Sequence, residues 1–382
     1  MATATTPISG TARNGSAEAQ GVSGSFQSQR FPDGMRRNSI LRPRYHPDGY
    51  LERLDRDTFW YDAIWDAGRL TLVCPPFNNL RRRVRRARFQ LDGRDVALAR
   101  LRRYRRHDLL EFVAPKTPAR ILVQIGDWQG ESGISIAQTD LFAGLNSAFY
   151  LSKDNDLEWL VDHARYHKAM HGLQGLVAVD NGSSRYAPEE IEAALAPVGL
   201  ERLVVLSAPF KFGPLGLTPY RNTEKYLQTA VGNMVRLRYL SRARAVLSCD
   251  VDELVYGKDG ANVFDAAVTS RLGIVQVPGH WRLPDPEATP PFRHAHHTRV
   301  QVPPRDTPSK FCIVPQGPLR RFSWDVHNPE RLPFFRRMTD DRFEMIHCRA
   351  LTTGWKDPGR IAAPDGTVTD PLAEQALAVL RG

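Results

Sequence analysis

The spacing of apolar and polar positions changes near residue 150. Before that point, short runs alternate apolar with polar residues, as in Leu70–Cys74, Phe89–Leu91 and Ala119–Val123. A period of two turns one row of side chains inward, and Asp92-Gly93 is a typical hairpin turn. The pattern predicts a small β-rich accessory domain over residues 31–147.

After residue 150, helical spacing alternates with short apolar strands. Expected helices run from about Leu157 to Met170, with Gly172 at the end, from about Pro188, and from Thr223 to Leu240. Expected strands lie at residues 176–179, 203–206 and 245–249. Because alternating strands and helices are typical of a parallel sheet, residues 148–360 are expected to form an α/β domain.

The two ends of the chain differ from this pattern. Residues 1–30 are rich in Ala, Thr, Ser, Gly and Gln and lack apolar periodicity, so we expect a disordered tail there. Residues 361–382 are expected to form a C-terminal tail or helix.

Composition indicates an ordinary globular protein, with 42% hydrophobic and 25% charged residues among 382. The four cysteines, Cys74, Cys249, Cys312 and Cys348, lack the paired spacing of a zinc site or a disulfide framework. No stretch of about 20 apolar residues occurs, and the first thirty residues hold no apolar signal segment. We therefore expect a cytoplasmic protein.

The net charge of +10 is concentrated in two arginine-rich runs, residues 81–86 and 101–106. Such runs attract nucleic acid, anionic lipid headgroups and anionic glycans alike. A solvated surface rich in arginine is an equally good interpretation. Charge therefore does not select a partner.

Acidic residues follow two of the predicted strands. Asp250-Val251-Asp252-Glu253 comes after one strand, and carboxylate oxygens together with substrate phosphates are the ligands that Mg²⁺ or Mn²⁺ prefers. Asp180 comes after another strand, in Asp180-Asn181-Gly182-Ser183-Ser184, which is either a turn or a nucleoside contact. Because ligands bind beyond the carboxyl ends of parallel strands, both motifs are expected to face one crevice.

The order of these motifs resembles bacterial glycosyltransferases of the family 2 and family 92-like types, which carry a GT-A nucleotide-sugar domain. The resemblance covers residues 148 to 356. Its nearer half consists of Lys153-Asp154-Asn155-Asp156, Glu158-Trp159, Tyr166-His167, Gly172, Asp180–Ser184, Lys225, Gln228, Asn233 and Asp250–Glu253. Its distal half consists of His280-Trp281, Lys310–Pro315, Val326-His327, His347-Cys348-Arg349 and Trp355-Lys356. Asp156 stands where the family usually has Glu.

The resemblance implies a GT-A fold and a role for each matching residue. The implied metal residues are Asp250, Asp252 and His347, and the implied cofactor is Mn²⁺ or Mg²⁺. The implied donor-binding residues are Lys153, Asp154, Asn155, Asp156, Asp180, Gln228, Lys310 and Arg349. Lys356 is a further cation that would neutralise diphosphate charge. The donor is expected to be a UDP- or GDP-sugar.

The resemblance also implies inversion at the anomeric carbon, which needs a carboxylate to accept the acceptor's proton. Asp285 and Glu287 are candidates for this base, and an exposed acidic turn is the alternative. Glu253 is a third candidate, although a carboxylate so near the metal is also suited to bracing its ligands. The histidines at 294, 296 and 297 are interpreted as an acceptor-loop or surface feature.

The leading hypothesis is a metal-dependent glycosyltransferase that acts on a glycan or lipid-linked acceptor in surface polysaccharide synthesis. Its arginine-rich first domain would approach an anionic substrate or the inner face of the cell membrane, and nucleic acid is not expected as a partner. A metal-dependent phosphoryl or nucleotidyl transferase would use the same carboxylates. A noncatalytic polyanion-binding protein would use the first domain.

Overall fold

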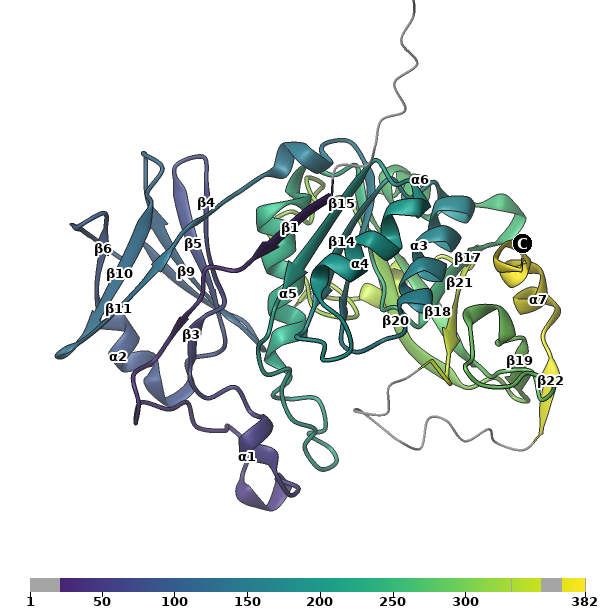
Figure 1. The fold of residues 1–382 in the computed structure, drawn as a ribbon, viewed down its shortest axis with the longest axis horizontal. Coiled ribbons are helices and arrows are strands. Elements are labelled where there is room, and N and C mark those ends of the chain that lie inside the picture. Colours follow the sequence, from purple (N-terminus) through teal and green to yellow (C-terminus); the bar gives the residue numbers. More distant parts are fainter. Residues whose placement is uncertain (1–20, 331, 352–365, 382) are drawn as a thin grey trace, which may run out of the picture.

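The computed structural model describes residues 21–330, 332–351 and 366–381. Figure 1 shows a large central sheet flanked by helices, with smaller β-sheets on one side. The predicted α/β class is therefore confirmed at the level of a mixed α/β protein with one large sheet.

The large sheet has nine strands, of which the first five in spatial order are parallel. The spatial order is β1 (Gly21–Ser25), β15 (Arg202–Ser207), β14 (Gly175–Asp180), β13 (Asn146–Ser152), β16 (Ala245–Ser248), β20 (Asp306–Ile313), β18 (Ile274–Arg282), β21 (Phe343–Cys348) and β17 (Glu253–Gly257). Strand β20 runs antiparallel to both of its neighbours, and β17 runs antiparallel to β21.

Helices cover both faces of this sheet because its strands are apolar on both faces. Along β14, Leu176 and Ala178 belong to one hydrophobic core, whereas Val177 and Val179 belong to the other. The first core also contains residues of α3 (Leu157–His171), α4 (Pro188–Leu195) and α6 (Val263–Thr269). The second contains residues of α5 (Tyr226–Arg238). Helix α3 is followed by Gly172, the glycine predicted to end it, and Gly172 adopts the left-handed conformation.

The strand order places a crevice beside β13. The chain leaves β13 toward β14 and β15, and then returns to β16 on the other side of β13. Such a reversal separates the loops that follow β13 and β16 and leaves room for a ligand at the carboxyl edge of the sheet. The loops that begin at Lys153 and Cys249 border this point.

Residues 58–136 form the β-rich part that the alternating pattern predicts. One sheet contains β12 (Ser135–Ile136), β4 (Asp62–Asp66), β5 (Arg69–Cys74), β9 (Asp108–Val113) and β8 (Arg100–Arg103), and the other contains β11 (Trp128–Gly133), β10 (Arg120–Ile125), β6 (Arg88–Leu91) and β7 (Arg94–Val96). Their apolar faces share a core in which Phe89 packs edge-on against Phe112. The short helix α2 (Arg81–Arg85) buries Val84 in the same core.

The predicted disordered tail over residues 1–30 is wrong for residues 21–30. Strand β1 pairs in parallel with β15 at the edge of the large sheet, and β2 (Gln29–Arg30) pairs with β3 (Thr58–Trp60). Backbone hydrogen bonds do not depend on side-chain composition, and the buried Phe26 adds an apolar contact. Residues 1–20 lie outside the described residues.

The C-terminal segment packs onto the α/β part. Strand β22 (Thr367–Thr369) pairs with β19 (Arg299–Gln301), and α7 (Pro371–Leu377) buries Ala373, Ala376 and Leu377 in the first core. Arg282 of β18 forms an ion pair with Asp370 (2.5 Å). The predicted residue Lys356 lies outside the described residues.

A buried arginine organises the start of the β-rich part. The Arg37 guanidinium is fully buried and donates to the backbone carbonyls of Pro76, Asp55 and Thr58 (2.6 to 2.7 Å). Arg37→Ala is expected to lower the free energy of unfolding by about 2–3 kcal/mol, because three buried carbonyls lose their donors. Urea titration measures the loss. Arg36→Ala, at an exposed neighbour, is the matched control, and equal effects would contradict this role.

Among the described residues, no helix combines the length and the apolar composition needed to cross a membrane.

Candidate active site

Three side chains converge where β16 ends and β17 begins. After Ser248 the chain turns, and the Glu253 N–H donates to the Asp250 carbonyl (3.0 Å). Strands β17 and β21 then place Glu253 directly opposite His347. His347 Nε2 lies 3.2 Å from an Asp252 oxygen, and His347 Nδ1 lies 3.5 Å from Glu253. Strand register thus assembles the cluster.

The cluster has a composition that suits a divalent cation. Asp252, Glu253 and His347 each offer a ligand atom, and these atoms all lie within 4.8 Å of one another. Two carboxylates and one imidazole match the oxygen and nitrogen ligands of Mn²⁺. The side chains of Asp252 and His347 are 17% and 11% exposed, so a ligand can reach them from the surface.

Asp250 has different partners from Asp252. Its carboxylate accepts from Lys310 Nζ (2.6 Å) and from Gln228 Nε2 (3.1 Å), and its side chain is 28% exposed. Lys310 comes from β20 and Gln228 from the first turn of α5. The structure therefore brings together the predicted residues Asp250, Gln228 and Lys310, beside rather than within the metal-ligand cluster.

Lys310 Nζ also forms an ion pair with a Glu253 carboxylate oxygen (3.1 Å), and both side chains are buried. Burial raises the pKa of the Glu253 carboxyl, Lys310 opposes that rise, and the Asp250 charge adds to it. Burial acts to lower the pKa of Lys310, but Asp250 and Glu253 outweigh it and raise this pKa. Glu253 is only 2% exposed, which favours the bracing role over the role of a base, and its assignment as a base stays a prediction.

Neighbouring rings support the cluster. The Trp281 ring, on the strand parallel to β21, lies 3.8 Å from the His347 ring, centroid to centroid. His294 Nε2 donates to the Val251 carbonyl (2.8 Å) and so fixes the loop between the two aspartates. His294 and His297 are fully buried, so the interpretation of residues 294–297 as a surface feature is wrong for these two. The segment folds back onto α3, where Arg293 forms an ion pair with Asp162.

Helix α3 carries a row of buried histidines behind the site. His163, His167 and Cys249 form a second group with close ligand atoms. His167 Nδ1 donates to the His163 carbonyl (2.9 Å), and His167 Nε2 accepts from the Val255 N–H (3.2 Å). This group is therefore part of the packed core.

His163 makes stability depend on pH. Neither of its ring nitrogens has a hydrogen-bond partner among the described residues, and burial lowers its pKa from 6.5 to about 3. In the unfolded chain the His163 ring takes up a proton below about pH 6.5, whereas in the folded chain it does so only below about pH 3. The folded state is therefore destabilised as pH falls through that interval.

His163→Leu is therefore expected to unfold in urea with a smaller loss of stability between about pH 7 and about pH 4 than the wild type shows. A pH dependence identical to that of the wild type would contradict the buried neutral state of His163.

A surface hollow, separate from the cluster, lies along the carboxyl ends of β13, β14 and β15. Its volume is about 400 Å³, and its lining includes Arg53, Lys153, Asn181, Phe210, Lys211 and Phe212. Lys153 Nζ donates to the Asn181 and Gly182 carbonyls (3.3 and 3.1 Å) and so joins the loop after β13 to the loop after β14. Cationic side chains and two phenylalanine rings are suitable surroundings for an anion attached to a planar base.

Two predicted donor residues near this hollow, Asp180 and Asp154, bind the loop that follows β14. Asp180 is buried and accepts from the Gly182 and Ser183 N–H groups (3.1 to 3.2 Å), so it forms the turn that its sequence also allowed. Asp154 accepts from the Ser184 N–H (2.6 Å). These bonds fix the shape of the loop, which contributes Asn181 and Gly182 to the lining of the hollow.

The neighbouring predicted residues also lie at this edge. Asn155 donates to the Ser152 hydroxyl (2.9 Å), and Asp156 pairs with Arg185 (2.7 Å) at the start of α3. Both positions therefore tie the loop after β13 to its surroundings.

The remaining candidates lie further along the chain. Arg349 follows β21 directly after the cluster, and its N–H donates to the Arg282 carbonyl (2.9 Å). Asp285 accepts from the Glu287 N–H (2.9 Å), and Glu287 is exposed. Asp285 and Glu287 form a turn beyond β18, and their assignment as a base stays a prediction.

Sequence patterns did not indicate every residue at the site. Arg53 is an exposed cation at the end of the four-residue helix α1 (Tyr50–Arg53), and Lys211 is an exposed cation in an irregular segment. Neither segment is long enough or regular enough for a periodic pattern to mark them. Asp325 lines a small cavity of about 20 Å³ together with Asp250 and Lys310, although it is 75 residues from Asp250 in sequence. Only tertiary packing reveals these neighbours.

Comparisons with known proteins identify no family. No protein-family model matches the chain, and no curated protein sequence matches it.

Proposed function

We propose that this protein is a metal-dependent glycosyltransferase with a GT-A type domain, which transfers a sugar from a nucleoside-diphosphate sugar. The observation that carries the proposal is the Asp252, Glu253 and His347 cluster at the end of β16, on the same sheet edge as the hollow beyond β13 to β15. The cluster follows β16 at the point where the strand order reverses, which is where open α/β sheets bind nucleotides, and the hollow reaches the other side of that point at Lys153, after β13.

Each part of the site has a role in this proposal. Asp252 and His347, braced by Glu253, would hold Mn²⁺ or Mg²⁺. The ion would neutralise the charge that develops on the departing nucleoside diphosphate. Lys153, Arg53 and Lys211 would contact the donor's phosphates or nucleoside, since charge-assisted donors bind phosphate oxygens strongly.

Lys310 and Gln228 act through Asp250. Their contacts hold the Asp250 carboxylate in one orientation beside the cluster. A carboxylate fixed in this way is prepared for the metal or for a donor hydroxyl without reorganisation during the reaction.

A thermal-shift screen tests this proposal. UDP-, GDP- and CMP-sugars are added with Mn²⁺ or with a chelator, and a nucleoside-diphosphate sugar is expected to raise the melting temperature only when Mn²⁺ is present. A CMP-sugar lacks the diphosphate and is the matched control. Stabilisation by no nucleotide sugar, or stabilisation that is equal with the chelator, would refute the proposal.

A further inference from the structure

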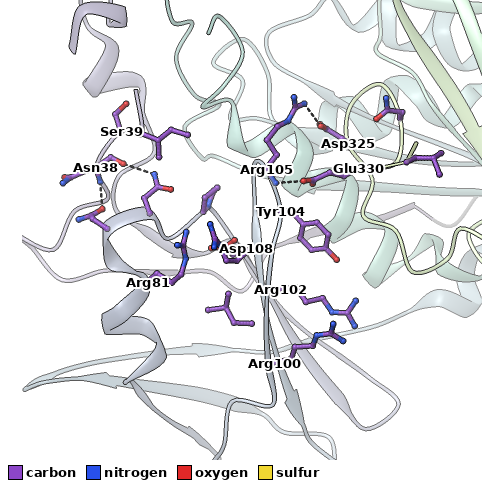
Figure 2. Close-up of a pocket in the computed structure, with 18 residues that line it drawn as sticks. Asn38, Ser39, Arg81, Arg100, Arg102, Tyr104, Arg105, Asp108, Asp325 and Glu330 are labelled. Atoms are coloured by element: carbon purple, nitrogen blue, oxygen red, sulfur yellow. Dashed lines mark hydrogen bonds and ion pairs between the residues drawn. The ribbon is translucent and has the colours of Figure 1, made fainter. Parts of the chain in front are cut away.

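A large cavity lies between the β-rich part and the α/β part (Figure 2), and it shares no lining residue with the hollow beyond β13 to β15. Its volume is about 1420 Å³, and its walls come from β8, from segments 38–40 and 76–81, and from residues 325, 328, 330 and 332. A second cavity of about 630 Å³ shares Arg100, Arg102 and Tyr104 with it, so β8 borders both. We call the two together the arginine cavity.

The arginine cavity is strongly cationic. Its larger part is lined by Arg81, Arg100, Arg102, Arg103 and Arg105, with the carboxylates Asp108, Asp325 and Glu330. Its smaller part adds Arg69, Arg236, Arg320 and Arg321, with Glu111. The arginines outnumber the carboxylates about two to one among these residues, so the cavity focuses a positive potential.

Three of these four carboxylates bond with arginine residues of the same cavity, and the fourth, Asp108, accepts from the Phe77 N–H (3.0 Å). Asp325 pairs with Arg105 (2.7 Å), and Glu111 pairs with Arg102 (2.9 Å), while Glu330 accepts from the Arg105 backbone N–H (2.5 Å). Figure 2 shows Arg105 reaching Asp325, with Arg100 and Arg102 further along the same wall. Arg100 and Arg103 are exposed on β8 and lie where an anionic ligand can reach them.

The cavity suits a sugar chain better than a nucleic acid or a membrane. A lipid surface cannot enter a concave space between two domains, whereas a flexible chain can. Single-stranded nucleic acid is held by successive aromatic stacking platforms, and Tyr104 is the single aromatic residue among those lining the larger part. Carboxylate oxygens that already accept from arginine keep lone pairs that can accept hydrogen bonds from sugar hydroxyls, which a single-stranded DNA backbone lacks. The side-chain amides of Asn38 and Asn328 add further hydrogen-bond donors and acceptors.

The cavity also approaches the proposed donor site. Asp325 lines both the arginine cavity and the small cavity that contains Asp250 and Lys310. It also accepts from the Thr229 hydroxyl of α5 (2.8 Å), one residue after Gln228. Asp325 therefore separates the arginine cavity from the side chains that hold Asp250.

We propose that the arginine cavity binds an anionic oligosaccharide, a sugar chain that carries carboxylate or phosphate groups, and that this chain is the acceptor side of the reaction. The acceptor role rests on the proposed transferase function. Binding of the sugar chain rests on the cavity itself.

Fluorescence anisotropy with a labelled oligogalacturonate and a labelled phosphorylated mannan oligosaccharide tests the binding and separates the two anion types. Neutral maltooligosaccharide, single-stranded oligothymidylate and phosphatidylglycerol vesicles are the comparison ligands. We expect one or both anionic sugar chains to bind, with an affinity that falls as salt increases, and the neutral sugar not to bind. Preferred binding of the oligothymidylate or of the vesicles would overturn the proposal.

Two double variants of equal charge locate the binding. Arg100→Ala/Arg103→Ala is expected to weaken binding by about tenfold or more, because two charge-assisted contacts are removed. Arg82→Ala/Arg86→Ala removes two exposed arginines outside the cavity lining and should change the affinity by less than about twofold. Equal losses in both would overturn the proposal. Should the first double variant fail to fold, Arg100→Gln takes its place with the same expected direction.

The same measurements separate this proposal from the donor-site proposal. Asp252→Asn should keep its affinity for the anionic sugar chain, and Arg100→Ala/Arg103→Ala should keep its Mn²⁺-dependent stabilisation by a nucleotide sugar. Loss of sugar-chain binding in Asp252→Asn would show that the ligand does not occupy the arginine cavity.

Discussion

Asp252→Asn is expected to weaken Mn²⁺ binding by about a hundredfold, which corresponds to about 2.7 kcal/mol. Asp252 contributes a charged oxygen that lies 3.2 Å from His347 Nε2, and an amide keeps the shape but loses the charge. Electron paramagnetic resonance of Mn²⁺ that remains in solution measures the affinity directly.

Asp341→Asn is the matched control, because Asp341 is exposed and lies outside the ligand cluster. It should bind Mn²⁺ as the wild type does. Equal Mn²⁺ affinity in Asp252→Asn and in the wild type would remove this cluster as the metal site.

Lys310→Met is expected to lower the free energy of unfolding by about 3–5 kcal/mol, because Glu253 would remain buried without its lysine partner. The loss should depend on pH. Burial raises the Glu253 pKa above 4.5, and the Lys310 charge lowers it. Removing the Lys310 charge therefore raises the Glu253 pKa further. A carboxyl whose pKa is raised in the folded state destabilises that state as pH rises from the pKa of the unfolded chain toward the pKa of the folded chain.

Urea unfolding at about pH 5 and about pH 8 measures this dependence, and the deficit of Lys310→Met should be smaller at the lower pH. Lys116→Met, at an exposed position of the β-rich part, should unfold like the wild type at both pH values. A deficit that does not change with pH would contradict the coupling between Lys310 and Glu253.

Periodicity predicted the elements that form the large sheet. Helix α3 begins at Leu157 and ends at His171, just before Gly172, and strands β14, β15 and β16 lie within about one residue of the apolar runs. These elements are stabilised by local spacing combined with burial, which the sequence displays. Strand β1 was missed because an edge strand is held by backbone hydrogen bonds with β15, and its Gly and Ser residues show no apolar pattern.

The site was predictable in part. Asp250, Asp252 and His347 were expected together, and register between β17 and β21 explains how residues almost 100 positions apart meet. The burial of His294 and His297 was not predictable, because it depends on how the loop after β18 folds onto α3. The arginine cavity was also missed, since a run of arginines looks the same whether it lines a cavity or a solvated surface.

Calorimetric titration of UDP and GDP into the protein tests the central claim most directly, namely that the Asp252, Glu253 and His347 cluster binds a nucleoside diphosphate through a divalent cation. We expect one of these nucleotides to bind in the presence of Mn²⁺, to bind at least about tenfold more weakly with a chelator, and to lose its Mn²⁺ dependence in Asp252→Asn. Equal affinity with and without Mn²⁺ in the wild type, or unchanged Mn²⁺ dependence in Asp252→Asn, would contradict the claim.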